Sequence, residues 1–234
     1  MKFEIAKEVF ELLPNGYFGV VSVSGIDNKK DIPELAEILA ANVSDCEKEF
    51  EGVKVKNAAE IAPYREAFRA IGINPNRYMC SIEALLDRIA KGKGFPHINN
   101  VVDLGNAISV KYKLPIGAHD MATVSDTLKV RPACQDDVFI PFGSSEEDNP
   151  AENEIVYVSD HQVRTRRWTW RQREVGKITE ETSDVLFPID GFVDFNKEKV
   201  EAAAKELAET AERLFGVKAV IGFIDKDNTV FTAE

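Results

Sequence analysis

One short segment combines the residue types that bind phosphate groups and stack on nucleic-acid bases. Residues 164–173 read Arg-Thr-Arg-Arg-Trp-Thr-Trp-Arg-Gln-Arg and hold five of the eleven arginines and both tryptophans of the chain. Guanidinium groups fit phosphate geometry, and indole faces stack on bases at roughly 1–3 kcal/mol per base. Laid out as a strand, the segment predicts an RNA-contacting arginine strip. Its members are Arg164, Arg166, Arg167, Trp168, Trp170 and Arg171.

The same segment has a second interpretation, in which its side chains belong to the interior. Tryptophan is usually highly buried, and the chain carries 40 Asp+Glu against 29 Lys+Arg, a net charge of −11. Carboxylates are therefore abundant enough to pair with every arginine. The acidic total also argues against a protein that coats nucleic acid through its overall charge. Composition alone leaves both interpretations open.

The other chemistry-bearing residues match no metal or cofactor motif. The cysteines are odd in number and lack metal-ligand spacing, and the histidines form neither HxH nor HExxH. A dinucleotide fingerprint, a Walker A loop and a nucleophile elbow are absent from the sequence. We therefore expect neither a metal nor a cofactor. The cysteines and histidines are Cys46, Cys80, Cys134, His97, His119 and His161.

Composition points to a soluble globular protein. Apolar residues make up 44% of the chain and charged residues 29%, which is ordinary for a packed domain. No apolar run approaches the ~20 residues that a membrane-spanning helix needs. The acidic residues that follow the first apolar residues are unlike a signal peptide. We expect a cytoplasmic protein without a membrane partner, and the sequence does not indicate its oligomeric state.

Hydrophobic spacing predicts the elements that must position these residues. Helices alternate irregularly with short strands, without the strict βαβ order of a doubly wound sheet. This mixture predicts an α+β fold with a sandwich-like β portion. The predicted helices span 31–50, 57–71, 81–91, 100–112 and 196–215, and the predicted strands span 17–23, 127–131, 137–140, 154–158 and 217–224.

The stretch 95–120 is similar to a known module. It reads Phe-Pro-His-Ile-Asn-Asn-Val-Val-Asp-Leu-Gly-Asn over 95–106 and Leu-Pro-Ile-Gly-Ala-His-Asp over 114–120. This resembles the editing module, the third and fourth domains, of the β-chain of bacterial phenylalanyl-tRNA synthetase, in which N-x-V-V-D-x-x-N precedes a helix and Pro-x-His-Ala-Phe-Asp. Segments 158–161 and 177–182 also look like that module. Free-standing relatives share Ser81–Leu86 and Arg167–Gln172, and the resemblance covers residues 10–225.

The resemblance implies both a fold and a function. In the synthetase, the module hydrolyses tyrosine wrongly attached to the phenylalanine tRNA, because an apolar pocket cannot strongly reject an isostere that merely adds a hydroxyl. For this chain it implies a three-layer α+β fold containing a β-sandwich of unusual topology. It implies a single domain over 1–234, with an N-terminal αβ part (1–75) and a core (76–234). The implied partner is tRNA or aminoacyl-tRNA.

The chain departs from the family pattern at the position of the editing histidine. Gly117 stands there, and His119 falls where the family has phenylalanine, so the role of that histidine does not carry over. His119 becomes a candidate general acid or base in its place. Glu154 is a second catalytic candidate, as the match to a glutamate that helps to bind the misattached amino acid. Asp120 is a third, able to position a water or an amino group.

The same block supplies candidates for substrate binding: Asn99, Asp103, Asn106 and Gly117. For the first three a local role competes with this assignment. Asn99 is placed to cap a helix, Asp103 lies in its first turn, and Asn106 can bond to local backbone. Asp120 is likewise a possible turn residue.

Two functions therefore compete. RNA-related binding ranks first, as a tRNA- or aminoacyl-tRNA-binding protein that hydrolyses mischarged aminoacyl-tRNA in trans if the site is catalytic. The alternative is a non-catalytic module that binds an amino-acid-like small molecule. Salt dependence separates them, because RNA binding through several arginines weakens steeply as salt rises.

Overall fold

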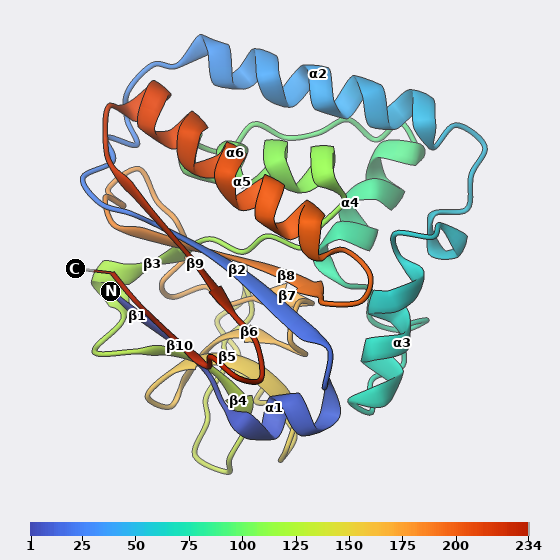
Figure 1. Cartoon of the computed structure of the whole chain (residues 1–234), viewed down its shortest axis with the longest axis vertical. Helices are drawn as coiled ribbons and strands as arrows, with labels where there is room; N and C mark the ends of the chain where they lie inside the picture. The colour runs from blue at the N-terminus through green and yellow to red at the C-terminus, as the bar shows by residue number, and fades with distance from the viewer. Residues whose placement is uncertain (234) are drawn as a thin grey trace.

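The computed structural model describes residues 1–233 and stacks three layers: helices, a four-stranded sheet and a six-stranded sheet (Figure 1). The four-stranded sheet is the middle layer. Its strands follow the order β3-β8-β2-β9, and all its pairs are antiparallel. They are β2 (Gly16–Val23), β3 (His119–Asp120), β8 (Val185–Phe192) and β9 (Ala219–Ile224).

The central strand β2 is buried on both faces. Phe18 and Val20 pack into the core between the two sheets, whereas Tyr17, Val21 and Val23 pack toward the helices. Because successive side chains of a strand point to opposite faces, a run of apolar residues suits a strand that is covered on both sides. The apolar run at 17–23 was therefore a reliable strand prediction.

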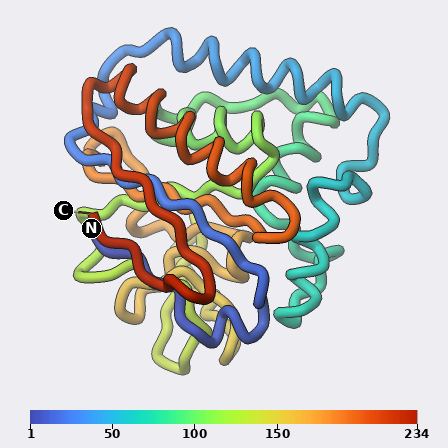
Figure 2. Tube along the Cα trace, in the orientation of Figure 1, coloured from blue at the N-terminus to red at the C-terminus, as the bar shows by residue number. Residues whose placement is uncertain are grey.

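The six-stranded sheet brings the two ends of the chain together. Its order is β10-β1-β4-β5-β6-β7, and β1 pairs with β4 in parallel and with β10 antiparallel. The N- and C-terminal ends therefore lie side by side (Figure 2). The strands are β1 (Lys2–Ile5), β4 (Leu128–Pro132), β5 (Ile155–Ser159), β6 (Gln162–Arg166), β7 (Arg171–Gln172) and β10 (Val230–Thr232).

Three helices form the outer layer over the four-stranded sheet (Figure 1). Helix α6 packs on the sheet, α5 packs against α6, and α2 packs against α5. Gly216 ends α6 in the left-handed conformation that favours glycine (φ 73°). No helix within residues 1–233 has the length and apolar composition to cross a membrane. The helices are α1 (Lys7–Leu12), α2 (Pro33–Glu49), η1 (Val55–Asn57), α3 (Ala62–Ala70), α4 (Ser81–Ala90), α5 (Asn100–Tyr112), η2 (Met121–Thr123) and α6 (Lys197–Phe215).

The predicted α+β class with a β-sandwich is confirmed, and three local predictions are wrong. The helix expected from residue 57 begins only at Ala62, after a short 3-10 turn. The strand expected at 137–140 is a loop, because the Asp137 side chain accepts the Cys134 backbone N–H and folds a turn. The arginine strip is two short strands joined by a turn, in which Arg167 and Trp168 have positive φ angles of 51° and 56°.

Candidate functional site

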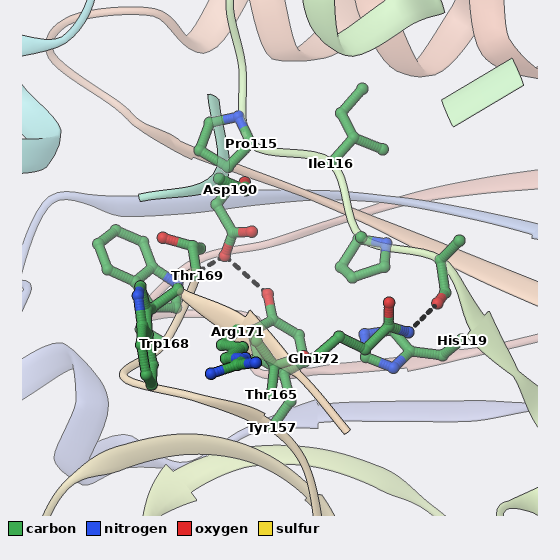
Figure 3. A pocket seen from close by; sticks show the side chains of 15 residues that line it. Pro115, Ile116, His119, Tyr157, Thr165, Trp168, Thr169, Arg171, Gln172 and Asp190 are labelled. Carbon is green, nitrogen blue, oxygen red and sulfur yellow. Dashed lines mark hydrogen bonds between the residues drawn. The ribbon is translucent and has the colours of Figure 1, made fainter. Parts of the chain in front are cut away.

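A small cavity lies where the two sheets meet the turn between β6 and β7 (Figure 3). Its volume is about 150 Å³. Segment 115–119, Tyr157, the 168–172 turn, Pro188 and Asp190 supply much of its wall. Because proline has no N–H to donate, Pro188 weakens strand pairing along this edge of β8. Segment 115–117 still pairs with this edge, because Gly117 donates its N–H to the Pro188 carbonyl and Asp190 donates its N–H to the Pro115 carbonyl, both at 3.0 Å.

The most unusual group in the wall is the carboxyl of Asp190. Its side chain comes from an apolar strand, and the residue is 2% exposed. Tyr157 Oη and Trp168 Nε1 donate hydrogen bonds to Oδ1 at 2.7 and 2.6 Å (Figure 3). Burial raises the pKa of Asp190 to about 7, although both hydrogen bonds act to lower it. Within residues 1–233, Oδ2 has no hydrogen-bond donor, which leaves it free for a ligand.

His119 forms the opposite side of the site. Its ring stacks on Tyr157, with centroids 5.4 Å apart and planes at 15°. Burial, helped by the charge of Arg164, lowers the pKa of His119 to about 3. The imidazole is therefore neutral at pH 7 and a weak base. A Cβ on Gly117 would lie 3.2 Å from His119 Nε2 and 3.2 Å from Pro188 Cγ, so the imidazole occupies the space that a side chain at position 117 would enter.

Comparison with known proteins identifies the family to which the chain belongs. A family model described as the B3/4 domain matches residues 63–216, which is more than half of the chain. The chain belongs to the B3/4 domain family. The resemblance noted in the sequence is thereby confirmed, and no curated protein matches the chain.

A solved structure supports the fold of this B3/4 domain. The chain is similar to an N-terminal fragment of the phenylalanyl-tRNA synthetase β-subunit from Pyrococcus horikoshii, with 13% identity and a TM-score of 0.50. The match covers 93% of this chain and 49% of that one. The B3/4 domain protein therefore spans about half the length of the structure that it matches, and at this identity the likeness concerns the fold.

Two of the three predicted catalytic residues lie outside the cavity wall of this B3/4 domain. Glu154 forms a two-pronged ion pair with Arg166, with both contacts at 2.8 Å. Asp120 accepts hydrogen bonds from the Ala122 N–H and from Thr182 Oγ1. Both carboxylates are thus engaged in holding turns and strands together, and a catalytic role for either stays a prediction. His119 does line the cavity.

The arginine strip requires a larger correction. Arg164, Arg166 and Trp168 are 6%, 3% and 0% exposed, so they do not form an RNA-facing surface. Arg166 pairs with Asp148 as well as Glu154, and Arg164 donates to Thr123 Oγ1 at 2.9 Å. The reason is that the strip folds back on itself and directs these side chains inward.

Only part of the arginine strip reaches the surface near the cavity. The guanidinium of Arg167 packs against both the Tyr78 and the Trp170 ring, 3.9 and 4.4 Å from their centroids. Arg171 is exposed and borders the cavity (Figure 3). RNA contact by Arg167, Trp170 and Arg171 therefore stays a prediction.

The predicted substrate-binding residues separate into two groups. Gly117 lines the cavity, whereas Asn99, Asp103 and Asn106 do not. Asp103 is fully buried and contacts His97 Nδ1 and the Ile98 N–H. These contacts stabilise the entry into α5, as the competing local interpretation predicted.

Asn99 is the N-cap of α5, since its side-chain oxygen accepts the Val102 N–H at 3.0 Å. We expect Asn99→Ala to lower the free energy of unfolding by about 1 kcal/mol, because one N–H of the first turn loses its acceptor. Asn99→Asp is the matched control and should be nearly neutral. Chemical denaturation followed by circular dichroism measures both, and equal losses for the two variants would contradict a capping role.

Proposed function

We propose that this B3/4 domain binds an aminoacyl group, presented on the 3′ end of a tRNA, with the carboxylate of Asp190 holding its α-ammonium. The observation that carries the proposal is the free Oδ2 of a buried carboxyl group that lines the cavity. A buried carboxylate without a cation is unfavourable, which is why its pKa is raised. A ligand ammonium would supply the missing positive charge. Family membership supports the aminoacyl class of ligand.

The size of the cavity fits this ligand class. At about 150 Å³ it is smaller than the roughly 300–1,000 Å³ that bury a drug-sized molecule. A single amino-acid side chain fits such a space better than a nucleotide does. Ile116, Pro188 and Trp168 give part of the wall an apolar character, which suits the side chain of an amino acid. The tRNA itself would remain outside, along the rim that includes Arg171.

The burial of the arginine strip predicts a weak dependence of tRNA binding on salt. Each phosphate contact to a single strand contributes a slope of about −0.7 in log K against log salt. If Arg171 makes the single phosphate contact, raising the salt from 50 to 200 mM should therefore lower the affinity about threefold. With three such arginines the affinity would fall about twentyfold. Arg171→Ala should abolish most of this dependence. Arg213→Ala, which removes an exposed arginine paired with Glu34 on the helical layer, is the control.

The decisive experiment compares two ligands that differ only in the ammonium group. We expect a non-hydrolysable aminoacyl-adenosine amide to bind at least tenfold more tightly than the same molecule acetylated on its α-nitrogen. Asp190→Asn should remove this difference, because the variant has no negative charge. Titration calorimetry measures the four affinities. Equal binding of the two ligands to the natural protein would overturn the assignment.

Deacylation is a separable property of the same site. His119 is a poor general base, and Asp190 would be engaged with the ammonium. Any hydrolysis would then rest on orientation of water and hydrogen bonds to the ester. Incubation of the purified protein with several mischarged tRNAs, followed by measurement of released amino acid, tests this. Release at the spontaneous rate would leave a binding protein without hydrolase activity.

A second candidate function is binding of an amino-acid-like small molecule without tRNA. The burial of Arg164 and Arg166 and the net charge of −11 favour it. In that case a free amino-acid amide should bind as tightly as the tRNA-linked group, with no salt dependence and no effect of Arg171→Ala. At least tenfold tighter binding of the aminoacyl-tRNA would reject this alternative.

A further inference from the structure

Three metal-ligating side chains meet on the six-stranded sheet, outside the cavity wall. Cys134 and Asp137 belong to the turn after β4, and His161 lies at the tip of the β5–β6 hairpin, next to Asp160 with its φ of 51°. Cys134 Sγ lies 3.7 Å from His161 Nδ1, and that nitrogen lies 3.3 Å from Asp137 Oδ1. All three donor atoms lie within 4.8 Å of one another.

This geometry differs from that of a catalytic triad. In a nucleophile–histidine–carboxylate relay, the two ring nitrogens of the histidine contact different partners. Here the same nitrogen of His161 faces both Cys134 and Asp137. The three donors therefore converge on a common point instead of forming a chain along which a proton passes.

The spacing of the donors matches a tetrahedral metal. Zinc bonds of roughly 2.3 Å to sulfur and 2.0–2.2 Å to nitrogen or oxygen place neighbouring ligand atoms roughly 3.3–3.6 Å apart. The observed separations of 3.3 and 3.7 Å lie close to these values. We propose that Cys134, Asp137 and His161 form a binding site for a divalent metal ion of the zinc type, with its fourth position open to water.

The neighbouring residues fix the orientation of the Asp137 carboxylate, whereas Cys134 and His161 are accessible to solvent. Asp137 is buried, and its carboxylate accepts two hydrogen bonds from Arg131, at 2.7 and 2.8 Å, and one from the Cys134 N–H at 2.9 Å. Burial acts to raise the pKa of Asp137, but these hydrogen bonds outweigh it and lower the pKa. Oδ2 accepts from both Arg131 Nη1 and the Cys134 N–H, whereas Oδ1 accepts only from Arg131 Nη2 and keeps a further lone pair for a metal. Cys134 and His161 are exposed, which gives an ion an entry path.

The charges also suit a divalent cation. A thiolate from Cys134 and the carboxylate of Asp137 together neutralise two positive charges, while His161 contributes a neutral ligand. Arg131 donates two hydrogen bonds to the Asp137 carboxylate and so fixes the orientation of this ligand, as hydrogen-bond partners of ligands do around metal sites. The site uses none of the residues of the proposed aminoacyl cavity, so the two proposals are independent.

Titration of the metal-free protein with Co²⁺ tests the site. Cobalt bound to a thiolate absorbs by charge transfer, and Cys134 is the sole exposed cysteine, since Cys46 and Cys80 are buried. We expect one cobalt ion per chain, displaced by Zn²⁺. Cys134→Ser should abolish the charge-transfer band, and His161→Ala should weaken metal binding at least tenfold.

His97→Ala is the matched control, because His97 is also an exposed histidine in contact with an aspartate, Asp103, but has no cysteine beside it. It should leave the metal affinity unchanged. Free Zn²⁺ at about 100-fold above Kd should raise Tm by about 5–10 °C in the natural chain and in His97→Ala, but not in Cys134→Ser. Absence of a stoichiometric cobalt complex, or one that survives both Cys134→Ser and His161→Ala, would overturn the proposal.

Discussion

Trp168→Ala is expected to lower the free energy of unfolding by about 3–5 kcal/mol, the range for removing a large buried aromatic side chain. Trp168 is fully buried, and its ring packs among those of Tyr64, Phe68 and Phe192, with centroids 6.1–6.4 Å away. The substitution leaves a cavity and removes a hydrogen bond to Asp190. Both effects destabilise the folded state.

Trp170→Ala provides the matched control for this prediction. Trp170 is partly exposed and contacts Tyr78 edge-on, with 4.9 Å between centroids. We expect it to cost about 1 kcal/mol, because its contacts with Tyr78 and Arg167 lie near the surface. Urea denaturation followed by far-ultraviolet circular dichroism measures both variants without depending on tryptophan fluorescence. A larger loss for Trp170→Ala than for Trp168→Ala would contradict the burial described above.

The two tryptophans show how far the sequence of the arginine strip predicts which of its side chains are buried. Laid out as one strand, the segment would place Trp168 and Trp170 on the same face, because side chains two residues apart share a face, but this requires an uninterrupted strand. The left-handed backbone at Arg167 and Trp168 breaks the alternation. Positive φ at such residues is uncommon, so local sequence gave no warning of it. The general alternative, that acidic residues neutralise the arginines, was correct for Arg166, which pairs with Glu154 and Asp148.

Elements with strong local signals were predicted well. Asn99 and the helix that follows it match the structure, because capping depends on residues adjacent in sequence. The strand β8 was missed, although its eight residues are all buried. Pro188, Asp190 and Gly191 are types that strands disfavour. Pro188 is accommodated because it lies on the side of β8 where pairing is sparse: β3 pairs with only Val185 and Leu186, and beyond them segment 115–117 bonds to the Pro188 carbonyl and the Asp190 N–H.

The candidate site could be predicted only in part for a related reason. Gly117 and His119 were found because they belong to one continuous motif. Asp190 was not, because its burial is created by Tyr157 and Trp168, 33 and 22 residues away in the chain. An aspartate inside an apolar run is the one signal in the sequence, and it indicates a buried carboxyl group without naming its partners.

Asp190→Asn is expected to make the protein more stable at pH 8 and to leave its stability nearly unchanged at pH 4. The pKa of Asp190 rises from 3.8 to about 7 on folding. The stabilisation that the protonated side chain contributes to the folded state is therefore fully present below pH 3.8 and is lost as the pH rises through about 7. The pKa difference is about three units, and each unit corresponds to about 1.36 kcal/mol, so the loss of stability between low and high pH is at most about 4 kcal/mol.

The asparagine variant escapes this loss because it resembles the protonated acid. Its side-chain oxygen can accept the same hydrogen bonds from Tyr157 and Trp168, and it carries no charge at any pH. Urea denaturation at pH 4, 6 and 8 measures the difference between the two proteins. Asp184→Asn, a substitution of an aspartate next to the same strand, is the control and should show no such divergence. A constant difference at all three pH values would contradict a raised pKa.

The ionisation of Asp190 that changes the stability should also change the affinity for the proposed ligand. An ammonium group binds the ionised carboxylate, so its affinity should fall about tenfold for each pH unit below 7. At pH 7 about half of the Asp190 carboxyls are protonated, and binding should release about half a proton per site. Calorimetry in two buffers of different ionisation enthalpy measures this release. The acetylated ligand and Asp190→Asn should both abolish it. Because that variant is the more stable protein at pH 8, its loss of binding could not be attributed to unfolding.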